Sequence, residues 1–298
     1  MKKINVNCNI CGSDNYEVLF PEGKAQIHRI VKCKNCDLMY ANPQTTNQTG
    51  GKVGLDTSDE SIITEEEIEN YTPEKNQYLK KQYLQIKDQK NVLDFIDSRK
   101  RGILLEIGAY AGNFCNEAQK RNWDIIGIEP FALPALYAKR TFNLDLINTP
   151  FEKCNLKPDS LAVVVSFHVI EHIYNPKDFV SKAYKLLAKD GLLILETPTY
   201  DSMSFKILKH RERSVRCEGH LYFFTKKSLG KLVESCGFKI IKHETVGRTL
   251  TLGRLLTNIG IILGTKNKFS NFIQKFHLEN IKLTLNMGDM QRIYCEKC

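Results

Sequence analysis

One segment, Leu104–Phe114 with the sequence LLEIGAYAGNF, constrains the fold of this chain more than any other. It begins with a short apolar run, which is typical of a strand buried in the middle of a parallel sheet. Gly108 and Gly112 then allow the backbone to turn sharply and a ligand to approach it closely. A strand, such a turn and a helix in this order predict an α/β fold with a cofactor cradle at the carboxyl end of the strand.

The residues around this turn indicate which cofactor it holds. A second apolar strand ends at Glu129, where an acid can accept hydrogen bonds from the ribose hydroxyls of an adenosine. The dinucleotide fingerprint G-x-G-x-x-G is absent, because Tyr110 and Asn113 stand where its second and third glycines belong. A pyrophosphate is therefore excluded. A ligand with an ammonium and a carboxylate fits better, since Glu106 can accept from the ammonium, and this ligand is S-adenosylmethionine.

The segment resembles the first motif of class I S-adenosylmethionine-dependent methyltransferases, acid-x-Gly-x-Gly-x-Gly, with Glu106, Gly108 and Gly112 in matching positions. Glu129 matches the acid that ends the second strand of that family. Tyr110 replaces the middle glycine and is expected to reshape the methionine end of the site. The competing interpretation is a tight strand-to-helix turn that binds no ligand.

Two later segments, Leu161–Pro176 and Leu186–Pro198, extend the resemblance. They are similar to the fourth and fifth strands of the superfamily, in the branch with an HVIEH segment that includes ubiquinone-pathway O-methyltransferases and sugar-modifying enzymes. Ala162 departs from the aspartate common in that strand. The resemblance implies a Rossmann-like, mostly parallel seven-stranded sheet with an antiparallel last strand. It also implies cofactor contacts at Glu106, Gly108, Ala109, Gly112, Glu129, Pro130, Phe151, Glu152, Phe167 and His168.

Four N-terminal cysteines, Cys8, Cys11, Cys33 and Cys36, form two C-x-x-C pairs with the spacing of a zinc ribbon. Four thiolates complete a tetrahedral shell around zinc and leave no position for water or substrate, so the predicted metal is structural. It would stabilise a segment too small to bury its own core. Iron in the same shell and a redox pair are the alternatives. Related families carry a similar ribbon followed by an aromatic residue and Asn-Pro, as in Asp37–Pro43.

The sequence predicts three parts: a zinc ribbon over 1–44, a linker with lid helices over 45–100, and the methyltransferase domain over 101–298. Within the second part, 45–64 should be a flexible connector and 65–98 helical.

Nothing in the sequence indicates secretion or insertion into a membrane. Met1–Cys8 is not followed by an apolar stretch, so we expect a cytoplasmic protein without a secretory signal. No apolar window reaches the length of a membrane span, and 250–263 is interpreted as a core or substrate-covering helix.

Positive charge is concentrated at the C-terminal end. Residues 201–298 contain 18 Lys and Arg against 8 Asp and Glu, and the densest run is Lys206–Arg216. This favours an anionic or phosphate-bearing acceptor such as a nucleotide-linked sugar, a polyanionic glycan or RNA. The alternative is an ordinary solvated surface.

Two histidines are the candidate catalytic residues. Glu218–Thr225 resembles the histidine-bearing region of sugar C-methyltransferases, which implies His220 as the general base. His172, next to Glu171, is the second candidate. A hydroxyl acceptor gains from a base in this pKa range, because its proton must leave as the new bond forms.

The predicted function is O-methylation of a sugar or another small hydroxylated metabolite. The alternatives are C-methylation of a nucleotide sugar and an rRNA or tRNA methyltransferase that binds RNA through its ribbon. A non-catalytic relative is a further alternative, suggested by Tyr110 and Ala162.

Overall fold

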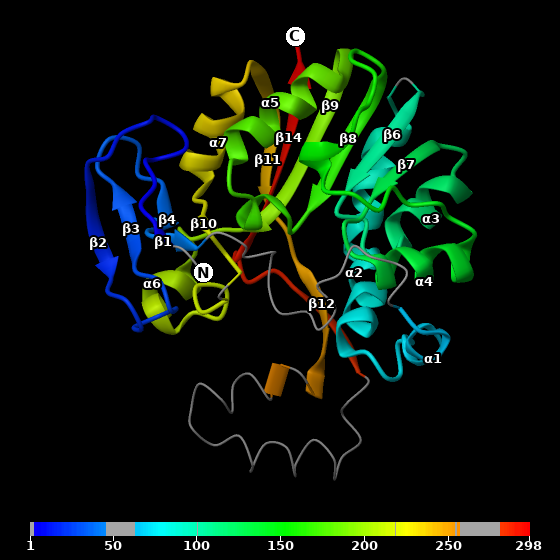
Figure 1. Cartoon of the computed structure of the whole chain (residues 1–298), viewed down its shortest axis with the longest axis horizontal. Coiled ribbons are helices and arrows are strands. Elements are labelled where there is room, and N and C mark those ends of the chain that lie inside the picture. The colour runs from blue at the N-terminus through cyan, green and yellow to red at the C-terminus, as the bar shows by residue number, and fades with distance from the viewer. Residues whose placement is uncertain (1–2, 46–62, 100, 218, 254, 257–280) are drawn as a thin grey trace.

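The structure is a computed structural model that describes residues 3–45, 63–99, 101–217, 219–253, 255–256 and 281–298 (Figure 1). The connector expected over 45–64 and the helix expected over 250–263 lie mostly outside the described residues.

A six-stranded sheet forms the centre of the molecule, in the spatial order β11-β14-β9-β8-β6-β7 (Figure 1). Four strands are parallel, and β14 runs antiparallel to both of its neighbours. The antiparallel strand of the prediction is therefore confirmed. The strands are β6 (Ile103–Ile107), β7 (Asp124–Ile128), β8 (Leu161–Phe167), β9 (Leu187–Pro198), β11 (Phe238–Thr245) and β14 (Met290–Lys297).

Two details of the sheet differ from the prediction. A seventh strand does not form among the described residues; Ile147 makes only an isolated parallel bridge with Ile128. The segment around Ile147 is short, because it is confined between Asn143, which ends the preceding helix in a left-handed conformation, and Pro150. In addition, β9 continues through Asp190 and Gly191 as an irregularity in its pairing with β8, instead of starting after them.

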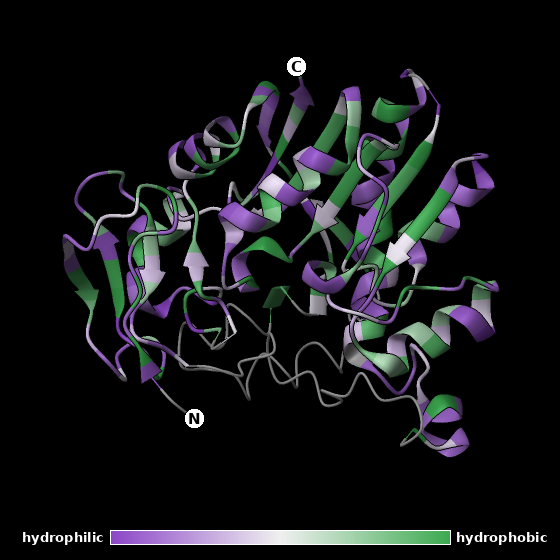
Figure 2. Cartoon of the chain, turned by 45° about the horizontal axis from the view of Figure 1, so that its top comes forward, coloured by the Kyte–Doolittle hydropathy of each residue, from purple (hydrophilic) through white to green (hydrophobic). Residues whose placement is uncertain are grey.

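Helices cover both faces of the sheet because neighbouring residues of each strand point to opposite sides. Leu104 and Val163 pack with α2 and α3, whereas Leu105 and Val164 pack with α5 and α7. Figure 2 shows the apolar strands between helices whose outer surfaces are polar. The helices are α1 (Glu65–Asn70), α2 (Gln77–Asp97), α3 (Asn113–Lys120), α4 (Ala132–Phe142), α5 (Pro176–Leu186), α6 (Met203–Leu208) and α7 (Lys226–Ser235).

Capping residues define where several of these helices begin. Thr64 and Glu67 form a capping box at α1, and Asn76 accepts the first free N–H groups of α2. Both helices therefore begin at these capping residues, in the part of the chain that precedes the central sheet. Thr225 and Ser228 form the corresponding box at α7.

Residues 3–45 lie on one side of the molecule and form the two-stranded sheet β1-β5 and three strands of a four-stranded sheet; we call this unit the four-cysteine module (Figure 1). A strand from the C-terminal part of the chain, β10, completes this sheet in the order β10-β4-β3-β2. The module is thus joined to the rest of the protein by backbone hydrogen bonds. Its strands are β1 (Lys3–Ile4), β2 (Tyr16–Phe20), β3 (Ile30–Cys33), β4 (Met39–Ala41) and β5 (Gln44–Thr45), with β10 at Tyr222–Phe223.

A second pair of strands, β12 (Arg248–Thr251) and β13 (Lys282–Leu285), lies beside α2. Thr249 donates hydrogen bonds to both carboxylate oxygens of Asp88 on α2, at 2.7 Å each. Within the described residues, none of the helices is both long and apolar enough to span a bilayer.

A buried ion pair links the sheet to α2. Arg292 of β14 is 1% exposed, and its Nε and Nη2 donate to one carboxylate oxygen of Glu196 at 2.8 and 2.6 Å. Nη2 also donates to the carbonyl of Asp88 at 3.2 Å. Removing only one member leaves a buried charge without its partner, which is costly.

We therefore expect Arg292→Met to lower the free energy of unfolding by about 3–5 kcal/mol, measured by urea denaturation. Lys139→Met is the matched control, because its pair with Asp145 is exposed on both sides, and it should cost less than about 1 kcal/mol. Equal losses in the two variants would contradict the assignment of a structural role to the buried pair.

Candidate functional site

The predicted cofactor turn lies at the carboxyl end of β6 and has the backbone of a tight turn. Gly108, Tyr110 and Gly112 have positive φ values of 78°, 48° and 74°. A Cβ on Gly108 would lie 2.4 Å from Cγ2 of Val169, so the turn closely approaches the loop that follows β8. This contact brings the first and fourth strand ends of the predicted site together.

Tyr110 adopts the left-handed conformation expected of the glycine that it replaces. Its hydroxyl receives a hydrogen bond from Tyr71, and its ring lies 5.0 Å from that of Tyr78. The side chain therefore packs against residues of α2 and of the segment before it. Tyr110, in place of glycine, therefore covers the side of the turn that faces these helices.

Glu129 connects the ends of β6 and β7. One of its oxygens accepts from the backbone N–H of Tyr110 at 2.8 Å and the other from Phe131 at 3.0 Å. Each carboxylate oxygen has two lone pairs, so both can accept a further hydrogen bond.

Two acids at this end of the sheet have raised pKa values. Burial raises the pKa of Glu106 to about 8, although the thiol and backbone N–H of Cys115 donate to it. Burial likewise raises the pKa of Glu129 to about 7, against its two backbone donors. Both acids are buried, and among the described residues no cation pairs with either of them.

Asn113, the first residue of α3, offers an unused donor. Its side chain is buried and its Nδ2 has no hydrogen-bond partner. The first turn of a helix also presents free backbone N–H groups, which favour an anion. This position therefore suits the carboxylate of a ligand.

Both candidate catalytic histidines lie in a single cluster. The rings of His172 and His220 are 4.7 Å apart in an edge-to-face arrangement. A carboxylate oxygen of Glu171 and one ring nitrogen of each histidine lie within 4.8 Å of one another. Glu171 and His172 belong to the 3-10 turn that follows β8, whereas His220 precedes β10.

Hydrogen bonds orient the members of this cluster. His172 Nδ1 lies 2.8 Å from the carbonyl of Gly219, and because a carbonyl can only accept, Nδ1 carries the proton and Nε2 has the lone pair. His220 Nδ1 lies 3.2 Å from the Tyr200 hydroxyl. Thr197 donates to Glu171 Oε2 at 2.9 Å, and Glu171 Oε1 is buried without a hydrogen-bond partner.

The pKa shifts in this cluster have the opposite direction to those at the cofactor turn. Burial alone would raise the pKa of Glu171, but the adjacent His168, His172 and His220 outweigh it and hold that pKa at about 2. Burial, together with the nearby charge of His172, lowers the pKa of His220 to about 3. At neutral pH Glu171 is therefore anionic and His220 neutral.

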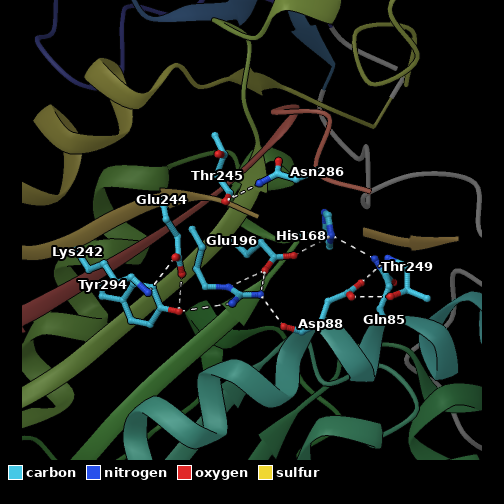
Figure 3. A network of polar contacts seen from close by, with 11 residues as sticks. Gln85, Asp88, His168, Glu196, Lys242, Glu244, Thr245, Thr249, Asn286 and Tyr294 are labelled. Carbon is cyan, nitrogen blue, oxygen red and sulfur yellow. Dashed lines mark hydrogen bonds and ion pairs between the residues drawn. The ribbon is translucent and has the colours of Figure 1, made fainter. Parts of the chain in front are cut away.

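His168, predicted as a cofactor contact, lies in a polar network with Glu196 and Gln85 (Figure 3). Its ring nitrogens are 3.6 Å from Glu171 and 3.5 Å from Glu196, and Gln85 of α2 approaches at 3.4 Å. The structure thus places this side chain where it links the histidine cluster to the buried Glu196–Arg292 pair.

The other predicted contacts lie beside the following residues. Phe151 is buried with its ring 5.2 Å from Phe179 of α5, and Glu152 beside it is exposed. Phe167 packs on Phe114 at 5.0 Å. Ala109 is buried against α3 and α4, and Pro130 follows Glu129.

The four N-terminal cysteines converge as their spacing predicts. Cys8 Sγ lies 3.3 Å from Cys36 Sγ, and Cys11 Sγ lies 3.6 Å from Cys33 Sγ. All four sulfurs lie within 4.8 Å of one another, which fits the edges of a tetrahedron around one metal ion.

Sequence reasoning missed three residues near the site. Tyr200 follows the end of β9, and the rule that ligands bind at the carboxyl ends of parallel strands could have identified it. Asn113 was noted only as a missing glycine. Gln26, whose side chain reaches the loop before His220, has no recognisable signal in the sequence.

Comparison with known proteins agrees with this geometry. The family model described as a methyltransferase domain matches residues 76–243. The chain belongs to this family and is an S-adenosylmethionine-dependent methyltransferase with the class I fold. No curated protein sequence matches the chain significantly.

Comparison with solved structures finds similarity at low sequence identity. A Thermotoga maritima S-adenosylmethionine-dependent methyltransferase, described as a possible histamine N-methyltransferase, superposes with a TM-score of 0.50 at 18% identity, covering 78% of this chain and 98% of that one. The cyclopropane synthase MmaA2 of Mycobacterium tuberculosis gives 0.47 at 15% identity, with 72% and 84% covered. Phosphoethanolamine N-methyltransferase 2 of Haemonchus contortus, in complex with S-adenosyl-L-methionine, gives 0.45 at 15%, with 76% and 58% covered.

The raised pKa of Glu106 leads to a stability prediction. Between its ordinary value of 4.5 and the folded value of about 8, the folded protein holds a proton that the unfolded chain releases. The free energy of unfolding should therefore fall as pH rises through this window, by up to about 1.4 kcal/mol per pH unit. Glu106→Gln should flatten this slope in denaturation measured without added cofactor. Glu152→Gln, at an exposed position, should leave it unchanged; an identical slope in wild type and Glu106→Gln would contradict the prediction.

Proposed function

We propose that this methyltransferase transfers a methyl group to a hydroxyl of a small, sugar-like acceptor. The observation that carries the proposal is the convergence of Glu171, His172 and His220 on the loop that contacts the cofactor turn through Val169 and Gly108. When bound, S-adenosylmethionine would supply a methyl group attached to a sulfonium sulfur. The acceptor oxygen would displace this sulfur in line and take the methyl group. The protein has to hold the two partners and take up one proton.

The residues at the turn fit this cofactor. Glu129 retains acceptor capacity for the ribose hydroxyls, and Asn113 offers its unused amide to the carboxylate. Glu106 and Glu129 are buried without a cation, so a cationic ligand would stabilise their charged forms. We assign cofactor binding to Glu106, Asn113, Glu129 and the backbone of the turn.

Within the histidine cluster, the geometry supports His172 as the general base. Its Nε2 has the free lone pair, because Nδ1 is committed to the Gly219 carbonyl, and its side chain is partly exposed. Glu171 would stabilise the imidazolium that forms when His172 takes the acceptor proton. His220 is 8% exposed and its pKa of about 3 makes it a weak base, so we assign it to packing against His172 and shaping the acceptor pocket.

The acceptor is proposed to carry a negative charge. Burial raises the pKa of Tyr78 to about 12 and also raises that of Cys217, and the charge of Glu171 adds to both shifts. The charge of Arg213 opposes both shifts, so it acts on the space beside Glu171. Arg211 and Arg216 of the same basic run are exposed. A phosphate or carboxylate on the acceptor would neutralise this charge.

The four-cysteine module is proposed to bind one structural zinc ion. Four sulfurs in a closed tetrahedral set are the ligand set of structural zinc. Cys8, Cys33 and Cys36 are buried and Cys11 is exposed, so the site lies at the rim of the module.

The base assignment predicts the effect of two histidine substitutions. His172→Ala should lower kcat by about 10²–10⁴-fold, because the acceptor proton loses its base. His220→Ala should lower it less. The assay is methyl transfer from tritiated S-adenosylmethionine to a panel of sugars, sugar phosphates and nucleotide sugars, with NMR of the product to separate O-methyl from C-methyl.

Cofactor affinity is the control in this experiment. The affinity for S-adenosylhomocysteine, measured by calorimetry, should stay unchanged in both variants. His243→Gln should behave as wild type, since His243 contacts Gln291 at 3.0 Å within the sheet. Full turnover by His172→Ala would remove His172 as the base.

The metal assignment predicts about one zinc per chain in purified protein, measured by elemental analysis. Cys33→Ser should lose the metal and lower Tm, because the small module depends on it for stability. Cys236→Ser, outside the cluster, should retain both. Iron in place of zinc, or full stability of metal-free protein, would contradict the proposal.

A further inference from the structure

The side chain of Gln26, from the four-cysteine module, reaches the loop that carries His220. Gln26 is 4% exposed, and its Nε2 donates to the carbonyls of Val215 and Cys217 at 2.8 and 2.6 Å. The carbonyl of His220 itself lies 3.4 Å from the same nitrogen. The side-chain amide of Gln26 thus contacts three backbone carbonyls of one loop.

The same loop is tied to the catalytic turn on its other side. The N–H of His220 donates to Cys217 at 3.0 Å, and the N–H of Leu221 donates to the carbonyl of Glu171 at 2.8 Å. The module adds one more contact, from the N–H of Ala41 to the carbonyl of Leu221 at 2.8 Å. The backbone around His220 is therefore held between the module and the turn that contains Glu171 and His172.

Regular secondary structure does not position this loop. Between the 3-10 turn Lys209–Arg211 and β10, the described residues belong to no helix or strand. Val215 of the loop is buried in a cluster with Ile30 and Met39 of the module. The rest of the loop depends on individual hydrogen bonds, and Gln26 supplies a side-chain donor that reaches it from the module.

We propose that Gln26 is a positioning residue, which holds the loop before β10 so that His220 stays packed against His172 and Glu171. The four-cysteine module is then part of the acceptor site, not only a stabilising appendage. This inference rests on the proposed function, because it takes the cluster of Glu171, His172 and His220 as the acceptor side of the site.

The environment of His220 provides a direct readout. Its ring lies beside Tyr200, His172, Glu171 and His168, and the backbone of Ser214 hydrogen-bonds to it. While the loop is held, the ring is shielded from water and stays neutral. If the loop loosens, water reaches the ring and its protonation becomes easier.

The test compares full-length wild type with Gln26→Met, which keeps the length of the side chain but removes the donor. Ile27→Ala is the matched control, since Ile27 is the next residue and is 47% exposed. The imidazole signal of His220, assigned with His220→Gln, is followed by NMR over pH about 5–8. We expect no titration in wild type or Ile27→Ala, and titration with a midpoint approaching about 6.5 in Gln26→Met.

Hydrogen exchange gives the second measurement. The amides of His220 and Leu221 should exchange at least about tenfold faster in Gln26→Met. The affinity for S-adenosylhomocysteine should remain within about twofold of wild type, because the loop does not form the cofactor turn.

Two outcomes would overturn the inference. One is an unchanged His220 signal with unchanged exchange in Gln26→Met. The other is loss of the fold or of cofactor affinity together with the His220 shift, which would assign Gln26 to general stability. Neither measurement needs an acceptor, so a failure to find hydroxyl methylation would leave this test intact and would count against the proposed function alone.

Discussion

A row of buried charges crosses the carboxyl ends of the central strands, and the site depends on it. Arg292 pairs with Glu196, the ring of His168 lies between Glu196 and Glu171, and Glu171 faces His172. Buried charges are tolerated only where opposite charges and hydrogen bonds compensate them. Each member of the row therefore constrains the position of the next, and the histidine cluster is linked to the sheet beneath it.

The acceptor side and the cofactor side of the site differ in how their buried acids are compensated. On the acceptor side, histidines surround Glu171 and keep it anionic. On the cofactor side, Glu106 and Glu129 have only neutral donors, and burial raises the pKa of each. A cationic cofactor supplies the positive charge that Glu106 and Glu129 lack. Binding should thus change the charge state of the cofactor side while Glu171 keeps its charge, which separates cofactor recognition from proton transfer.

The fold and the cofactor turn were largely predictable from sequence because their determinants are local. Gly108 and Glu129 follow two parallel strands, and the carboxyl ends of such strands necessarily meet at one edge of the sheet. The missing seventh strand was not predictable, because pairing around Ile147 depends on how far the backbone can extend before Pro150. Hydrophobic periodicity in the sequence indicates which face of a strand is buried, but it does not indicate which strand it pairs with.

The acceptor side could be predicted only as separate candidates. His172 lies in the 3-10 turn after β8 and His220 lies before β10, so only the tertiary structure brings their rings together. No sequence pattern encodes the approach of Gln26, because its partners are backbone carbonyls. Likewise, no sequence pattern indicates the packing of Phe151 against Phe179 of α5.

The pairing of β10 with β4 also explains how so small a module can be stable. Residues 3–45 enclose too few side chains for an independent core. Val31 and Tyr40 instead share a core with Leu221, Tyr222 and the central sheet. Metal binding and docking would then stabilise the same strands, since Cys33 ends β3 and β4 follows Cys36. A module stabilised in this way cannot leave its place without moving the loop that contains His220.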